Sequence, residues 1–159
     1  MKRILTATAI AAALAAGNAQ AAGQATNGFN VTINLTSACT LTAPTDVVFA
    51  YTSLQAGASA ATGGGFSVSC TSTLPYTLGL QSGNGAATPP GAATIAVTDN
   101  AVNLNYSLGL SAAGATGNGL AQAFSVTGTM AGSQAGTCAA ASCTNAAATN
   151  KTHTLIVNY

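Results

Sequence analysis

The chain has 159 residues, of which only 3% are charged and 48% are hydrophobic, with four cysteines and one histidine. So few Lys and Arg residues exclude an electrostatic surface for nucleic acid or for anionic lipid, because both need clusters of basic side chains. A surface with almost no charge also lacks electrostatic repulsion and tends to associate, which suits a subunit of a polymer better than a free soluble enzyme.

Residues 1–21 have the features of a secretory signal peptide. Lys2 and Arg3 form a basic start, residues 4–16 form an apolar stretch, and the segment ends in an Ala-x-Ala cleavage pattern. An uncleaved anchor is the alternative, but the apolar stretch is shorter than the roughly 20 residues that a membrane-spanning helix needs. We therefore predict an exported protein whose mature chain starts at Ala22.

Residues 29–35 form the first alternating apolar run of the mature chain. Phe29, Val31, Ile33 and Leu35 fall on the same face when the chain is extended, because side chains alternate along a strand. This pattern allows two interpretations. The run is either the first strand of a closed sandwich or a strand that the protein donates to a neighbouring copy.

Short runs with a period of two, bounded by Gly, Asn, Pro and Ser, predict the remaining strands. They cover residues 46–51, 66–70, 75–80, 94–97, 102–110, 124–130 and 153–159. We expect residues 52–65 and 111–122 to be loops and residues 132–150 to be mostly irregular. About seven or eight short strands, each apolar on one face and rich in Thr, Ser and Asn on the other, predict an all-β antiparallel sandwich.

The last of these runs, 153–159, has no turn or cap after it. A strand at one end of the chain and a spare apolar run near the other favour completion of the fold by another copy. We then expect Leu155, Val157 and Tyr159 to border the gap that the donated strand fills, since they alternate along one face of the last strand.

The four cysteines form an even set in an exported chain, which predicts two disulfides. Three pairings are possible. We favour Cys39 with Cys70, which closes a loop of about thirty residues and stabilises the fold by roughly 3–4 kcal/mol, and Cys138 with Cys143, which holds a small surface loop. A metal or redox site is the alternative, but the second pair lacks both C-x-x-C spacing and neighbouring ligands.

Few residues of the chain can do acid–base or nucleophilic chemistry. Beyond the signal segment it holds one histidine, His153, two aspartates, Asp46 and Asp99, and no glutamate. A Ser/His/Asp site would need that single histidine together with one of the two aspartates. Both aspartates stand beside turn residues, where hydrogen bonds to the local backbone account for them. We therefore predict that the protein is not an enzyme and uses no metal or cofactor.

Several short motifs, taken in order along the chain, resemble one known family. They are Asn34-Leu35-Thr36-Ser37-Ala38-Cys39, Ser67-Val68-Ser69-Cys70, Tyr76-Thr77-Leu78-Gly79-Leu80, Leu104-Asn105-Tyr106-Ser107-Leu108 and Thr154-Leu155-Ile156-Val157-Asn158-Tyr159. Over roughly residues 28–159 the chain resembles the spore coat protein U domain family, whose best understood members are subunits of archaic chaperone–usher pili. The Cys138/Cys143 pair is not part of the family pattern, and Thr152 stands where the family usually has an Asp.

The resemblance implies an incomplete immunoglobulin-like antiparallel β-sandwich that lacks its last strand and is completed by donor-strand exchange. It divides the chain into a signal peptide (1–21), an N-terminal donor segment (22–35) and a pilin domain (36–159). The partners that it implies are other copies of this protein or related pilins, a periplasmic chaperone and an outer-membrane usher, with no nucleic acid.

As a function, the resemblance implies a structural subunit of a surface pilus or fibre that supports adhesion and biofilm formation. Such a subunit is exported to the periplasm and then reaches the cell surface. Two alternatives stay open: a secreted or spore-coat-type structural or binding β-sandwich, and a small outer-membrane β-barrel. A barrel needs strands of about ten residues, and few of the runs are that long.

Overall fold

The computed structural model describes residues 23–83 and 90–159, which are all-β and contain no helix. The predicted signal peptide, residues 1–21, lies outside the described residues. The chain divides into two units, residues 1–34 and residues 35–159, and every strand belongs to the second unit. The strands are β1 (Cys39–Leu41), β2 (Val47–Val48), β3 (Ser59–Ala60), β4 (Thr62–Gly63), β5 (Gly65–Cys70), β6 (Pro75–Ser82), β7 (Thr94–Thr98), β8 (Asn105–Leu110), β9 (Gly114–Thr116), β10 (Gln122–Met130) and β11 (His153–Asn158).

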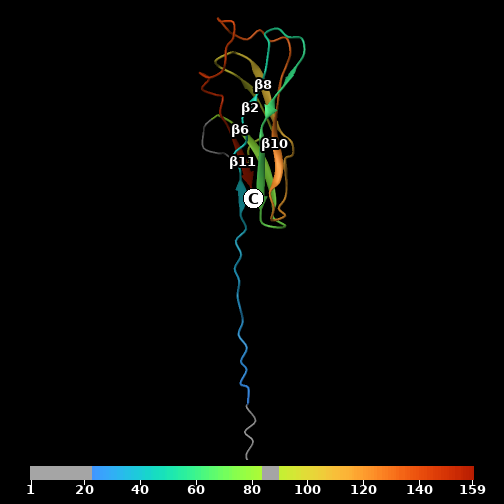
Figure 1. Cartoon of the computed structure of the whole chain (residues 1–159), viewed down its shortest axis with the longest axis vertical. Coiled ribbons are helices and arrows are strands. Elements are labelled where there is room, and N and C mark those ends of the chain that lie inside the picture. Colours follow the sequence, from blue (N-terminus) through green and yellow to red (C-terminus); the bar gives the residue numbers. More distant parts are fainter. Residues whose placement is uncertain (1–22, 84–89) are drawn as a thin grey trace, which may run out of the picture. The chain divides into compact units, whose positions relative to one another are not determined.

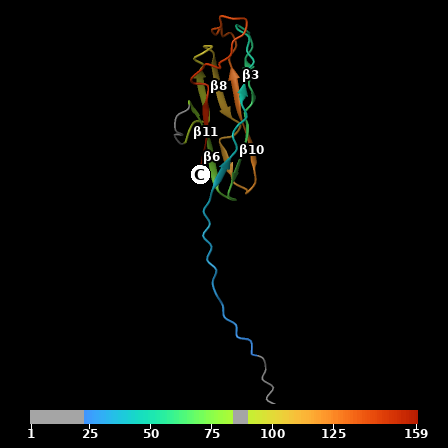
Figure 2. The same ribbon diagram turned by 60° about the vertical axis from the view of Figure 1, so that its left-hand side comes forward.

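These strands form two main sheets in which every pair is antiparallel. The larger sheet has the order β1-β5-β10-β8-β7, and β3 also pairs with β10; the second sheet has the order β11-β6-β9. Figure 1 labels β8 and β10 of the larger sheet and β6 and β11 of the second. The short strands β2 and β4 pair with each other. Figure 2, turned by 60°, again shows β11 beside β6. The predicted fold class, an antiparallel all-β sandwich, is confirmed.

The core lies between the inner faces of the two sheets. Alternation places Phe66 and Val68 of β5 inside, and Tyr76, Leu78 and Leu80 of β6 face them; all five are at most 7% exposed. Burying side chains of this size contributes about 1.5–3 kcal/mol each. In both strands every second residue is apolar, and these are the residues that point into the core. The hydrophobic pattern alone therefore fixes which face of each strand points inward.

Three aromatic rings join the two sheets at one end of this core. The ring of Phe124 on β10 stacks on Phe66 with centroids 5.7 Å apart, and it meets the edge of Tyr76 at 6.2 Å. The Tyr76 hydroxyl donates to Oε1 of Gln122 at 2.9 Å, so its buried polar end is satisfied. Burial also raises the pKa of Tyr76 above its ordinary value of 10.0.

Several predicted boundaries were wrong, for local reasons. The strand expected over 102–110 begins only at Asn105, because residues 99–104 form a turn in which Asn103 has a φ of 52° and the Asp99 amide donates to the Leu104 carbonyl at 2.8 Å. The run 46–51 keeps only the two-residue strand β2. Short strands β3, β4 and β9 lie inside the expected loops, and residues 132–150 carry no strand, as predicted.

Residues 90–92 cross over the outer face of the second sheet and cover part of it. Gly79 of β6 pairs with Ile156 of β11, and a Cβ at Gly79 would collide with the carbonyl oxygen of Pro90. Only glycine therefore lets residues 90–92 pass so close to the strand. The Asn158 side chain donates to the Pro90 carbonyl at 3.0 Å. Ile156 is consequently buried, although it lies on the face of β11 that points away from the core.

Candidate assembly interface

Two edge strands have partners on one side only. Within the described residues β1 pairs with β5 alone, and β11 pairs with β6 alone. The outer side of an edge strand presents backbone N–H and C=O groups that another strand can pair with. In both Figure 1 and Figure 2 the end of β11, marked C, lies beside β1, the blue-green strand near residue 40. The two free edges therefore face a common region of the domain.

The core-facing side chains of β11 are incompletely covered. Leu155 pairs with Leu80 and Val157 pairs with Leu78, so these residues lie on the same side of the sheet as the buried core of β6. Leu78 and Leu80 are buried, whereas Leu155 and Val157 are only half-buried and Tyr159 is 64% exposed. Core-facing apolar residues on an edge strand remain partly wet when the neighbouring strand is missing.

Strand β1 shows the same incomplete cover on the other sheet. Leu41 pairs with Val68, which is completely buried, yet Leu41 itself is 38% exposed. The sequence did not single out Leu41 as a border residue, although its alternation with Cys39 could have shown that both face the core. We call Leu41, Leu155 and Val157, the incompletely covered apolar residues of the two edge strands, the apolar seam.

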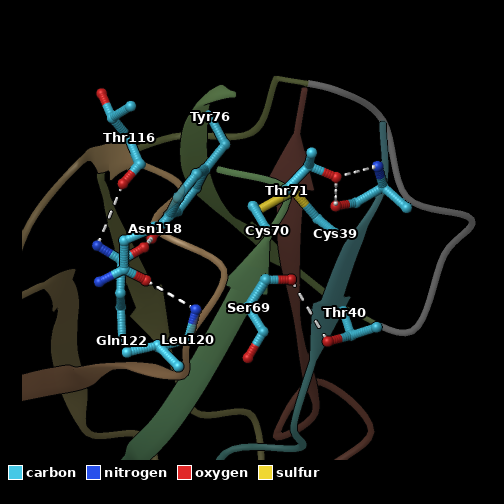
Figure 3. The surroundings of a disulfide bond; sticks show 11 residues. Cys39, Thr40, Ser69, Cys70, Thr71, Tyr76, Thr116, Asn118, Leu120 and Gln122 are labelled. Atoms are coloured by element: carbon cyan, nitrogen blue, oxygen red, sulfur yellow. Dashed lines mark hydrogen bonds between the residues drawn. A yellow bond between two sulfur atoms is a disulfide. The ribbon is translucent and has the colours of Figure 1, made fainter. Parts of the chain in front are cut away.

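The Cys39–Cys70 disulfide fixes β1 to the body of the domain. Cys39 and Cys70 are directly opposite each other in β1 and β5, with Cα atoms 4.1 Å apart. Figure 3 shows the bridge with the hydrogen bonds around it: Thr40 Oγ1 donates to the Ser69 carbonyl at 3.4 Å, and Thr71 Oγ1 accepts from the Ala38 amide at 3.0 Å. This predicted disulfide is present, and it holds an otherwise short, three-residue edge strand in place.

The apolar run near the N-terminus makes no strand in the structure. Phe29, Val31, Ile33 and Leu35 are between 73% and 87% exposed, and residues 23–38 contain no strand. Four large hydrophobic side chains in one extended run are costly to leave in water, at about 1.5–3 kcal/mol each. This segment therefore holds four large hydrophobic side chains that the fold of its own domain does not cover.

A histidine stands where β11 begins. His153 Nε2 lies 2.8 Å from the hydroxyl oxygen of Tyr106 on β8, and the two rings meet edge to face with centroids 5.9 Å apart. Its other ring nitrogen, Nδ1, is buried without a hydrogen-bond partner among the described residues. Burial lowers the pKa of His153 below its ordinary value of 6.5, which favours the neutral ring. Sequence alone did not pair His153 with Tyr106.

Asp99 anchors the segment that leads into β11. This carboxylate is 2% exposed; its Oδ1 accepts from the amides of Ala101 at 2.8 Å and Val102 at 2.9 Å, and its Oδ2 accepts from Asn145 Nδ2 at 3.0 Å. Desolvation raises the pKa of Asp99, but these hydrogen bonds, together with the charge of Lys151, outweigh it and leave the pKa lowered. The local turn bonds were predicted, whereas the link to Asn145 was not.

Further hydrogen bonds connect the turn after β7 to the residues just before β11. Asn100 and Thr149 exchange two hydrogen bonds, Nδ2 to Oγ1 at 2.6 Å and the Thr149 amide to Oδ1 at 3.1 Å. Asn150 Nδ2 donates to the carbonyl of Thr98 at 2.7 Å. The turn after β7 therefore holds the irregular segment just before His153, and this fixes where the edge strand β11 starts.

The second predicted disulfide, Cys138–Cys143, is also present, with Cα atoms 5.7 Å apart. Its cysteines and all residues between them are exposed. Among the residues that the structure describes, no three His, Cys, Asp or Glu side chains gather in a way that could hold a metal ion. The same residues include no helix that is long and apolar enough to cross a membrane.

The fold and the two disulfides define an all-β domain of the kind found in exported proteins. The family model of the Spore Coat Protein U domain matches residues 25–156, and the chain belongs to that family. Its members are structural components of extracellular fibres and coats. Comparisons with curated proteins and with solved structures give no match.

Proposed function

We propose that this protein is a fibre subunit that polymerises by strand donation, with residues 29–35 of one copy filling the seam between β1 and β11 of the next. The observation that carries this proposal is that the domain has an incompletely covered apolar seam and that the chain also has an exposed apolar run whose side chains could cover it. The two parts are the apolar seam of Leu41, Leu155 and Val157 along two free strand edges and the exposed apolar run of residues 29–35.

The lengths of the two parts agree. In β11, core-facing positions recur at His153, Leu155 and Val157, and Tyr159 continues this spacing one residue past the end of the strand. The N-terminal run offers four apolar side chains with the same spacing of two residues. A donated strand pairs its backbone with the free edge of β11 and places alternate side chains over the core. Burying four such side chains contributes roughly 6–12 kcal/mol before the cost of ordering the segment.

The same free strand edges explain why a chaperone and an usher are expected as partners. A subunit that exposes apolar side chains and unpaired strand edges aggregates unless another chain covers them. In our proposal, the signal peptide of residues 1–21 directs export of the subunit to the periplasm and is then removed. A chaperone covers the seam there, and at an outer-membrane usher the donor run of the next subunit replaces the chaperone. The finished fibre then serves adhesion and biofilm formation at the cell surface.

The test uses two neighbouring substitutions in the donor run. Ile33→Asp puts a charge on the apolar face of the run, whereas Thr32→Asp puts the same charge on the opposite face. Material sheared from the cell surface is run on a denaturing gel with and without boiling. We expect a heat-sensitive ladder for the wild type and for Thr32→Asp, and loss of the ladder for Ile33→Asp. An unchanged ladder in Ile33→Asp would overturn the proposal.

A further inference from the structure

We propose that the Cys138–Cys143 disulfide is a thiol-exchange site, at which an external thiolate opens the bridge in the folded protein and forms a mixed disulfide. The inference does not depend on how the fibre assembles. It follows from three properties of this bridge: its exposure, the anchoring of its flanks, and its contrast with the other disulfide of the same chain.

Exposure makes the bridge accessible. Every residue from Thr137 to Ala147 is exposed, and only Ala and Ser side chains separate the two cysteines. Thiol–disulfide exchange requires a thiolate to approach a sulfur atom directly, so access controls its rate, and exposed bridges are the labile ones. Nothing larger than a methyl or hydroxymethyl group lies between Cys138 and Cys143 in the chain.

The flanks of the loop are held without the bridge. Before it, the Thr137 amide donates to the Val102 carbonyl at 2.7 Å. After it, Asn145 is bound to the buried carboxylate of Asp99 at 3.0 Å, and Ala148 is buried. The ends of the loop therefore keep their positions when the sulfur–sulfur bond opens. A disulfide whose opening leaves both ends of its loop in place can exchange while the domain stays folded.

The other disulfide provides an internal contrast. Cys70 is 3% exposed within the core cluster, and Cys39 packs against that cluster. Because Cys70 is buried and Cys39 is half-buried, a thiolate has less access to this bridge than to the exposed Cys138–Cys143 pair. The two bridges of one folded molecule should therefore differ in their reaction with the same thiol.

The exchange balances without a further oxidant. The incoming thiolate RS⁻ attacks Sγ of one cysteine, the Cys138–Cys143 bond breaks, and a bond between R–S and that cysteine forms. The other cysteine leaves as a thiolate and takes a proton from solvent. The sulfur of the external thiol is oxidised and the released cysteine sulfur is reduced, so the number of disulfides is unchanged.

The experiment treats the folded, exported protein with reduced glutathione, and in a parallel arm with a folded protein that carries one exposed cysteine. Released thiols are then trapped with N-ethylmaleimide, and the adducts are located by fragmentation mass spectrometry. We expect a mixed disulfide at Cys138 or Cys143 with the trap on its partner, at least about tenfold more often than any adduct at Cys39 or Cys70. Adducts in the first arm alone would restrict the site to small thiols.

The matched control is the double variant Cys138→Ser/Cys143→Ser. It should retain the circular dichroism spectrum of the folded wild type and give no adduct in either arm. Two results would overturn the proposal: an absence of adducts in the folded wild type, or equal modification of Cys39 and Cys70. Fibre assembly is measured separately, so failure of strand donation leaves this test intact.

Discussion

His153 and Tyr106 join the two sheets through one hydrogen bond of 2.8 Å between Nε2 and the phenol oxygen, at the point where the edge strand β11 begins. The opposite ring nitrogen of His153 is buried without a partner in the described part of the chain. A second proton on this ring would therefore place a charge, and an unsatisfied N–H, between the sheets.

This relationship predicts that the domain loses stability in mild acid. Burial lowers the pKa of His153 in the folded state, so the unfolded chain takes up a proton near pH 6.5 before the folded chain does. The free energy of unfolding therefore falls as the pH drops from about 6.5 toward the lowered folded pKa. Urea unfolding at a series of pH values measures this decline.

Tyr106, which is hydrogen-bonded to His153, and Asp99, whose charge acts on Tyr106, both keep their charge state in this pH range. Burial, followed by the charge of Asp99, raises the pKa of Tyr106 above 10.0, and the pKa of Asp99 is lowered below 3.8, so neither titrates near pH 6. His153→Gln should consequently flatten the pH dependence in this window. A decline of the same size in His153→Gln would show that another group causes it.

Asp99 is the second point where one side chain holds two segments together. Asp99→Ala would leave the amides of Ala101 and Val102 and the amide group of Asn145 without their acceptor. We expect a loss of stability on the order of 3 kcal/mol, since hydrogen bonds to charged groups are strong and buried unpaired donors are costly. Chemical denaturation gives the value. The exposed aspartate provides the control, because Asp46→Ala should change stability by less than about 0.5 kcal/mol.

Alternation along the sequence was enough to predict the long strands, because a half-buried strand repeats every two residues. It placed Leu155 and Val157 on one face of the last strand, and the structure puts that face toward the core. It could not show that Ile156, on the other face, would also be buried. That burial depends on residues 90–92 crossing Gly79, a contact between distant parts of the chain that no local pattern records.

The sequence was likewise enough to predict some residues of the candidate interface but not others. The exposed run 29–35 and the last strand could be identified from their patterns, whereas the contribution of Leu41 depends on the pairing of β1 with β5. The bonds of His153 to Tyr106 and of Asp99 to Asn145 join residues more than forty positions apart. Such pairs follow from the packing of the sheets and have no signature in a single sequence.

The two disulfides should contribute unequally to stability. In the chain-entropy model, loss of the Cys39–Cys70 bridge, with a sequence separation of 31, costs roughly 3–4 kcal/mol, and loss of Cys138–Cys143, with a separation of 5, costs about 2 kcal/mol. Urea unfolding of the two double Cys→Ser variants compares them directly. Equal losses would contradict the view that the first bridge is the one that secures an edge strand.

Supplying the donor run from within the same chain should convert the subunit into a stable monomer. A copy of residues 24–36 joined after Tyr159 by a short flexible linker can fold back along β11, as the second strand of an antiparallel hairpin does. We expect this variant to lose the heat-sensitive ladder and to unfold at a higher temperature than the parent, because the seam is filled at a high effective concentration. In the matched control the appended copy carries Val31→Asp and Ile33→Asp, and it should neither raise the unfolding temperature nor suppress the ladder. If both appended segments behaved alike, residues 29–35 would not be the strand that fills the seam.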